Sequence, residues 1–130
     1  MKSVLLHLAG SVEMNGQKDW QACLVAALGD RNVTIVNPPP ARNQRDDLEW
    51  ELDGLERADL VAMWFAPDTV APITLLELGL AARQDKLVVG CADGFWRRSN
   101  IEIVCQRFAI PLTTSWAAFV AVVCAKPDQA

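Results

Sequence analysis

Apolar residues in this chain occur in short runs that are separated by polar turns. Runs that are apolar at consecutive positions, or rich in β-branched residues, are typical of buried strands. They predict strands at residues 4–8, 33–36, 60–65, 87–91 and 110–112. Between these runs, apolar positions recur at helical spacing, and the expected helices span residues 18–28, 45–57, 72–84, 100–108 and 116–125. Pro72 suits the first turn of its helix, and Gly29 suits the end of the first one.

This alternation of strands and helices predicts an α/β fold with a parallel sheet covered on both faces. Five such units give a three-layer, flavodoxin- or Rossmann-like domain with a five-stranded sheet. A chain of 130 residues is too short for two cores, so we expect a single domain over 1–130 with a polar tail from about residue 126. Ligands of such sheets bind beyond the carboxyl ends of the strands. This rule directs attention to residues 7–13, 37–43, 64–72 and 91–100.

The overall charge and composition narrow the class of partner. A formal net charge of −4 argues against binding nucleic-acid polymers through their phosphates. The apolar stretch Val4–Ala9 is too short for a signal peptide or a membrane span, so we expect a cytoplasmic protein with no membrane partner. The chain has no G-x-G-x-x-G, Walker or metal-ligand pattern, so no cofactor or metal is expected. The four cysteines lie in apolar segments, which predicts buried free thiols.

Glu77 is the most unusual charged residue, because it lies in the otherwise uncharged helical segment ITLLELGLAA. Its neighbours three and four positions away are uncharged, so no residue of its own helix can neutralise it. A buried carboxylate without a partner costs several kcal/mol or becomes protonated. Either Glu77 pairs with an Arg or Lys from another element, or it serves the site at the strand ends. The second interpretation is favoured by the position of its helix after the strand at 60–65.

Glu51 is the second candidate acid. It lies about 60° from the centre of the stripe formed by Leu48, Leu52 and Leu55, at about 100° per helical residue. This places it at the edge of the expected buried face. A solvated acid on an acidic helix is an equally good interpretation of the pattern.

Other candidates lie near the expected strand ends. His7 precedes the turn Gly10-Ser11, where the glycine allows a ligand to approach the backbone closely. Trp64 and Trp96 have flat rings on which a base could stack. For His7 and for each tryptophan alone, packing in the core is the more common role.

Three segments of the chain resemble the nucleoside 2-deoxyribosyltransferase superfamily, which also contains the 2'-deoxynucleoside 5'-phosphate N-hydrolases. They are LAGSVEMN, WELDGLERADLVAMWF and ITLLELGLAARQDKLVVG. The most specific motif is E-L-G-x-A-x-x-x-x-K, which runs from Glu77 to Lys86. The resemblance covers about residues 3–112 and is strongest to the nucleoside deoxyribosyltransferase-like branch.

The resemblance implies that Glu77 is the nucleophile and that Glu51 is the supporting acid. Glu51 stands eight residues before Asp59, where better-studied branches have aspartate. His7 replaces a family tyrosine. Ala71 replaces the aspartate of the transferases or the serine of the phosphohydrolases, so Asp68 or Thr69 would have to substitute for it.

The resemblance also implies an assembly, because family members complete their pockets across subunit interfaces. We therefore expect a homo-oligomer, with the loop Phe95–Asn100 contributing Asn100 to a neighbouring pocket. The substrate-binding residues expected from the residues and the resemblance together are His7, Gly10, Ser11, Trp64, Asp68 and Asn100.

The expected function is cleavage or transfer at the N-glycosidic bond of a (deoxy)nucleoside or its monophosphate. Glu13 near Ser11 disfavours a 5'-phosphate, whereas Arg97 and Arg98 would attract one, so a nucleoside is slightly favoured. An alternative is a non-catalytic module that binds a nucleotide or an NAD-derived metabolite. A third hypothesis is a structural subunit that uses the helix around Glu77 as its interface.

Overall fold

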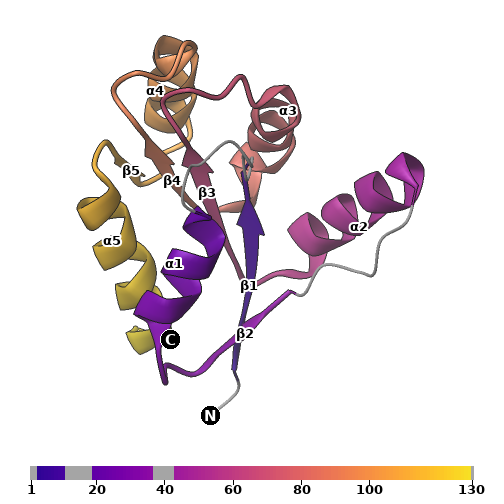
Figure 1. The fold of residues 1–130 in the computed structure, drawn as a ribbon, viewed down its shortest axis with the longest axis vertical. Helices are drawn as coiled ribbons and strands as arrows, with labels where there is room; N and C mark the ends of the chain where they lie inside the picture. Colours follow the sequence, from indigo (N-terminus) through magenta and orange to yellow (C-terminus); the bar gives the residue numbers. More distant parts are fainter. Residues whose placement is uncertain (1–2, 11–18, 37–42, 130) are drawn as a thin grey trace.

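The described part of the computed structural model, residues 3–10, 19–36 and 43–129, contains one parallel sheet (Figure 1). Its strand order is β2-β1-β3-β4-β5, which confirms the expected five-stranded α/β fold. The strands are β1 (Val4–Ala9), β2 (Val33–Ile35), β3 (Leu60–Phe65), β4 (Leu87–Cys91) and β5 (Leu112–Thr113). The strand expected at 110–112 begins later, because Ile110 is buried in the core and follows Ala109 at a positive φ of 55°.

Helices cover both faces of this sheet, with α1 and α5 on one side and α3 and α4 on the other (Figure 1). The helices are α1 (Trp20–Leu28), α2 (Gln44–Arg57), α3 (Pro72–Ala81) with its 3-10 extension η1 (Ala82–Gln84), α4 (Arg98–Arg107) and α5 (Trp116–Asp128). Asp19, Asn43 and Ser115 accept hydrogen bonds from the first-turn N–H groups of α1, α2 and α5. Helices α2 and α5 begin within one residue of the positions that the sequence pattern predicted, and α1 begins two residues later than predicted.

Side-chain alternation along the strands divides the core into two clusters. Leu8, Ala62 and Trp64 belong to the cluster under α1 and α5. Val61 and Met63 belong to the cluster under α2, α3 and α4. Because successive strand residues point to opposite faces, the three central strands β1, β3 and β4 contribute to both clusters.

Helix α2 contacts the rest of the protein mainly through its last turns. Gly54 and Leu55 are its buried residues, whereas Leu48 and Leu52 are exposed. Figure 1 shows the first turns of α2 projecting away from the sheet. The expected buried stripe was therefore wrong for two of its three leucines, since no described element packs over the start of this helix.

Lys86 binds the carboxyl end of α2. The Nζ atom of Lys86 donates hydrogen bonds to the carbonyl oxygens of Glu56 and Ala58, at 3.2 and 3.0 Å. These carbonyls are among those that an α-helix leaves unpaired at its end. The lysine of the E-L-G motif thus anchors the helix that carries Glu51.

All four cysteines are free. Cys91, Cys105 and Cys124 are buried as expected, but Cys23 is exposed on the outer face of α1, which corrects that part of the prediction. None of the described helices is both long and apolar enough to cross a membrane.

Candidate active site

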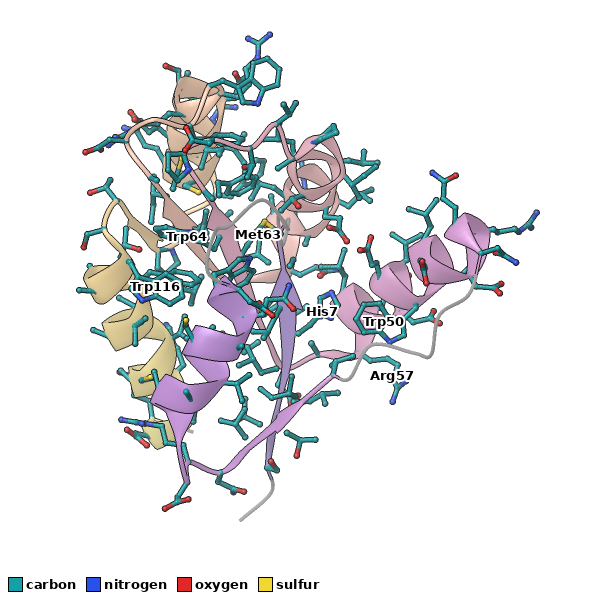
Figure 2. The ribbon with its side chains drawn as sticks, viewed as in Figure 1. His7, Trp50, Arg57, Met63, Trp64 and Trp116 are labelled. Carbon is teal, nitrogen blue, oxygen red and sulfur yellow. The ribbon has the colours of Figure 1, made fainter. Side chains whose placement is uncertain are left out.

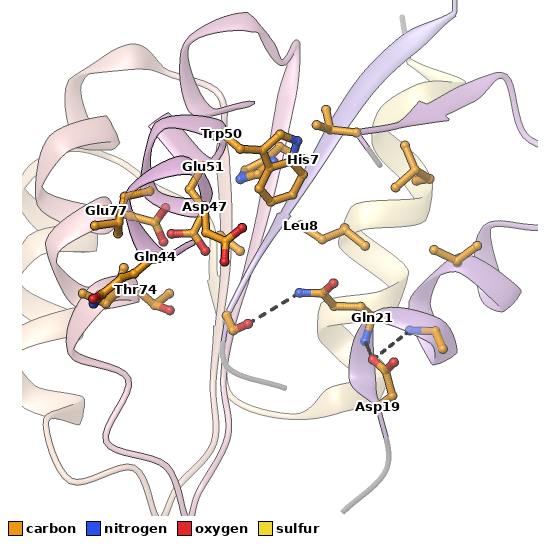
Figure 3. A pocket seen from close by; sticks show the side chains of 18 residues that line it. His7, Leu8, Asp19, Gln21, Gln44, Asp47, Trp50, Glu51, Thr74 and Glu77 are labelled. Carbon is orange, nitrogen blue, oxygen red and sulfur yellow. Dashed lines mark hydrogen bonds between the residues drawn. The ribbon is translucent and has the colours of Figure 1, made fainter. Parts of the chain in front are cut away.

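A cavity of about 600 Å³ opens beyond the carboxyl ends of β1 and β2 (Figure 3). Helix α1 borders it on one side, and α2 and α3 border it on the other. In the order β2-β1-β3, strand β1 lies where the chain changes direction across the sheet, so this is the expected ligand crevice. Four of the candidates named above line this cavity: Glu77, Glu51, His7 and Gly10.

Glu77 lines this cavity although only 4% of its surface is exposed. Its Oε2 atom has no hydrogen-bond partner among the described residues, and the described lysines and arginines form no ion pair with it. Burial and the nearby charge of Glu51 raise its pKa from 4.5 to about 7. Glu77 is therefore poised to exchange a proton near neutrality, which is common for catalytic acids.

Glu51 and Asp47 face the same part of the cavity from successive turns of α2 (Figure 3). Partial burial raises the pKa of Glu51, and the charge of Asp47 raises it further. Three carboxyl groups thus line the cavity from two helices, and the pKa is raised for two of them, Glu51 and Glu77.

His7 forms the floor beside these acids. It is 1% exposed, and its ring meets the Trp50 ring edge-on with centroids 5.4 Å apart. Gly54 makes this packing possible, because a Cβ atom there would lie 2.5 Å from Nδ1 of His7. Burial and the charge of Lys86 lower the pKa of His7 to about 4, so its ring is neutral at physiological pH.

The start of α3 forms another wall. Ala71 takes the N-cap position in a left-handed conformation, with φ 47° and no side-chain cap. Thr74, one turn before Glu77, is buried and lines the cavity with it. Thr69 does not reach the cavity, because its hydroxyl donates to the Ala66 carbonyl at 3.0 Å.

Other expected substrate-binding residues lie elsewhere. Trp64 packs against Trp116, with centroids 5.2 Å apart, on the opposite face of the sheet from His7 (Figure 2). Asp68 is exposed and does not line the cavity. Asn100 is exposed on α4 and lines a separate hollow between α3 and α4. Ser11 lies outside the described residues.

The two arginines that could have attracted a phosphate are also away from the described cavity wall. Arg98 pairs with Asp93 and, at 2.7 Å, with Glu102. The Arg97 guanidinium lies 4.6 Å from the centroid of the exposed Trp96 ring. The Nε1 atom of Trp96 in turn donates to the Val70 carbonyl at 2.9 Å.

Sequence reasoning missed several polar and aromatic residues that line the cavity. They are Asp19, Gln21, Gln44, Asp47, Trp50 and Thr74. A helical-wheel signal was present for some of them, since positions 44, 47 and 51 share one face of α2 and 74 shares a face with 77.

The parallel sheet and its cavity at the strand ends define a doubly wound α/β protein with a site for a small ligand. The chain belongs to the nucleoside 2-deoxyribosyltransferase-like family, whose model matches residues 3–95. No curated protein matches the sequence.

Two solved structures share the fold. One is the CMP N-glycosidase BcmB of Clostridium botulinum, with a TM-score of 0.63 and 14% identity over 92% of this chain and 97% of that one. The other is a conserved protein from Enterococcus faecalis V583, with a TM-score of 0.60 and 11% identity over 92% and 96% of the two chains. At these low sequence identities, the two comparisons show that the fold is shared.

Proposed function

We propose that this protein cleaves or transfers the N-glycosidic bond of a (deoxy)nucleoside or its monophosphate, with Glu77 as the nucleophile. The observation that carries the proposal is the buried, unpartnered Glu77 carboxyl in a cavity at the strand ends. Membership of the nucleoside 2-deoxyribosyltransferase-like family and a fold shared with a CMP N-glycosidase support it.

In the first step, the ionised Glu77 attacks C1' of the sugar while the C1'–N bond breaks. The electron pair of that bond leaves with the base, and the sugar becomes an ester of Glu77. The transition state resembles an oxocarbenium ion, which nearby carboxylates stabilise. In the second step, water or a second base attacks C1' as the bond to Glu77 breaks, and the proton of the attacking group passes to the ionised Glu51, which gives hydrolysis or transfer.

Glu51 is the group best placed to assist. In its protonated form it can donate to the departing base, and in its ionised form it can accept hydrogen bonds from the sugar hydroxyls. The raised pKa of both glutamates suits a pair that holds one proton between them. His7, with its lowered pKa, is a neutral wall of the site rather than a proton donor at physiological pH.

The test is an assay for free base on a panel of nucleosides, deoxynucleosides, their monophosphates and NAD. We expect release from at least one of them, and a loss of at least about 1,000-fold in Glu77→Gln with an unchanged circular dichroism spectrum. Glu49→Gln is the matched control, because Glu49 is exposed on α2 and does not line the cavity. Full activity of Glu77→Gln would overturn the assignment. Binding of a ligand without release of base would instead favour a sensor module.

A further inference from the structure

The described wall of the cavity carries negative charge from three helices. Asp47 and Glu51 come from α2, Glu77 from α3 and Asp19 from the start of α1. No lysine or arginine appears among the lining residues in the described part of the chain. The second, independent feature is the buried Oε2 atom of Glu77, which lacks a protein partner there.

The positive ends of three helices oppose this charge, since Gln44, the first residue of α2, also lines the cavity; the start of α2 is capped by Asn43. Helix α1 begins at the cavity, but its N–H groups are taken by Asp19, which accepts from Gln21 and Ala22 at 3.0 and 3.2 Å. Helix α3 begins there without a side-chain cap. A helix N-terminus carries only about half a unit of positive charge. The acids therefore outweigh it even when one of them is protonated.

An aromatic ring lies next to the acids. Trp50 precedes Glu51 on α2 and lines the cavity, and its position is fixed by its edge-on contact with His7 (Figure 3). Indole is the best aromatic partner for a cation. An aromatic face beside carboxylates is a suitable binding surface for a flat, positively charged ring.

We propose that this cavity selects N-glycosides of net positive charge, namely nucleosides whose base bears a fixed positive charge and whose sugar bears no phosphate. N-alkylated purine and pyridinium nucleosides belong to this chemical class. The inference rests on the proposed function, and it differs from the anionic substrate named for BcmB. When such a base leaves, the electron pair of the C1'–N bond neutralises its charge, so no proton donor is required.

The experiment measures binding rather than turnover, because charged bases are also better leaving groups. Glu77→Gln binds without reacting, and at about pH 6 glutamine resembles the protonated form that the raised pKa favours. Calorimetry compares guanosine, 7-methylguanosine and the 5'-monophosphates of both. We expect 7-methylguanosine to bind about tenfold more tightly than guanosine, and each monophosphate to bind about tenfold more weakly than its nucleoside.

Asp47→Asn tests whether the acids cause this preference. Asp47 is exposed, so its replacement removes a charge from the cavity without disturbing the core. In the Glu77→Gln background we expect the preference for 7-methylguanosine to fall about threefold, whereas Glu49→Gln leaves it unchanged.

Equal binding of guanosine and 7-methylguanosine would overturn the inference, and so would failure of all four ligands to bind. Tighter binding of the monophosphates would also overturn it and would indicate an anion site at the start of α3. The assay for free base on the wild-type protein distinguishes failure of this inference from failure of the proposed function. Release from neutral nucleosides without a charge preference contradicts this inference alone, whereas no release from any substrate contradicts the proposed function.

Discussion

Burial, and to a smaller extent the charge of Glu51, raises the pKa of the Glu77 carboxyl to about 7. A nucleophile must be ionised to attack, so the fraction of active protein depends on this pKa. The same repulsion that makes ionisation costly also raises the basicity of the carboxylate once it forms.

The pH profile of base release follows from this coupling. In the wild-type protein, kcat/KM is expected to rise as the pH increases through about 7, where Glu77 loses its proton. In Glu51→Gln one cause of the raised pKa is gone, so the rising limb moves to lower pH even if the maximum falls. Measuring kcat/KM between about pH 5 and 9 checks this. A limb that stays in place would contradict the coupling, and Glu49→Gln serves as the control.

Stability has a related pH dependence. The pKa of Glu77 is higher in the folded state than its ordinary value of 4.5, so its ionisation destabilises the fold as the pH rises through about 7. Glu77→Gln removes this effect. The free energy of unfolding of the variant relative to wild type is expected to be higher at about pH 8 than at about pH 5, by about 3 kcal/mol at most. Urea denaturation at the two pH values measures it, and a pH-independent difference would contradict it. The lowered pKa of His7 contributes equally to the pH dependence of both proteins, so its contribution cancels in the difference between their free energies of unfolding.

Helix α2 is positioned by two buried residues, Gly54 and Leu55, and the backbone of Gly54 lies against the ring of His7. Through this contact the strand β1 sets how near α2 comes to the sheet. Because Glu51 is one turn before Gly54, the same contact sets the position of the supporting acid relative to Glu77.

Two glycines on helices provide a matched pair for testing this arrangement. Gly54→Ala forces its Cβ atom into the His7 ring, so we expect a loss of about 1–3 kcal/mol in stability together with weaker activity. Gly79→Ala meets nothing within 4 Å and is expected to stabilise α3 by up to about 1 kcal/mol. Thermal denaturation measures both.

A double variant separates the steric cause from helix propensity. Replacing His7 with Ala removes the ring that the new methyl group strikes. In that background Gly54→Ala should cost much less or become favourable. An unchanged cost would show that the contact with His7 is not the reason.

At the scale of the whole molecule, helices α2 and α3 carry several exposed apolar side chains. On α3, Leu76 and Leu80 are 60% and 56% exposed. The remaining exposed members are Leu48, Leu52 and Ile73. Exposed apolar side chains that lie together are typical of a protein–protein interface, so these two helices are where we expect the contact of the predicted homo-oligomer.

We expect a charge on this surface to prevent assembly. Leu76→Glu combined with Leu80→Glu should convert an oligomer into monomers in analytical ultracentrifugation, because each buried carboxylate would cost several kcal/mol at the interface. Ala121→Glu, at an exposed position on α5, is the control and should leave the assembly intact. A wild-type protein that sediments as a monomer would contradict the prediction of a homo-oligomer.

Sequence alone was sufficient for most of the strands and helices and for the position of Glu77 beside the strand ends, because these follow from local chemistry. A strand or helix is predicted from signals within a few residues. These signals are the spacing of apolar positions and the glycines and prolines at its ends. Likewise, Glu77 is the one charged residue of the helical segment ITLLELGLAA that follows the strand at 60–65, and this can be read without knowing how the rest of the chain folds.

Tertiary structure decided the remainder of the site, because it depends on which distant segments meet. Alternation separates His7 from Trp64 once the strands are paired in register, and the pairing of His7 with Val61 puts the histidine on the α2 face. The Trp50 ring lines the cavity because the packing of α2 against β1 brings it into contact with His7. Whether an apolar side chain becomes core, cavity wall or exposed surface is set by long-range packing, which no local pattern encodes.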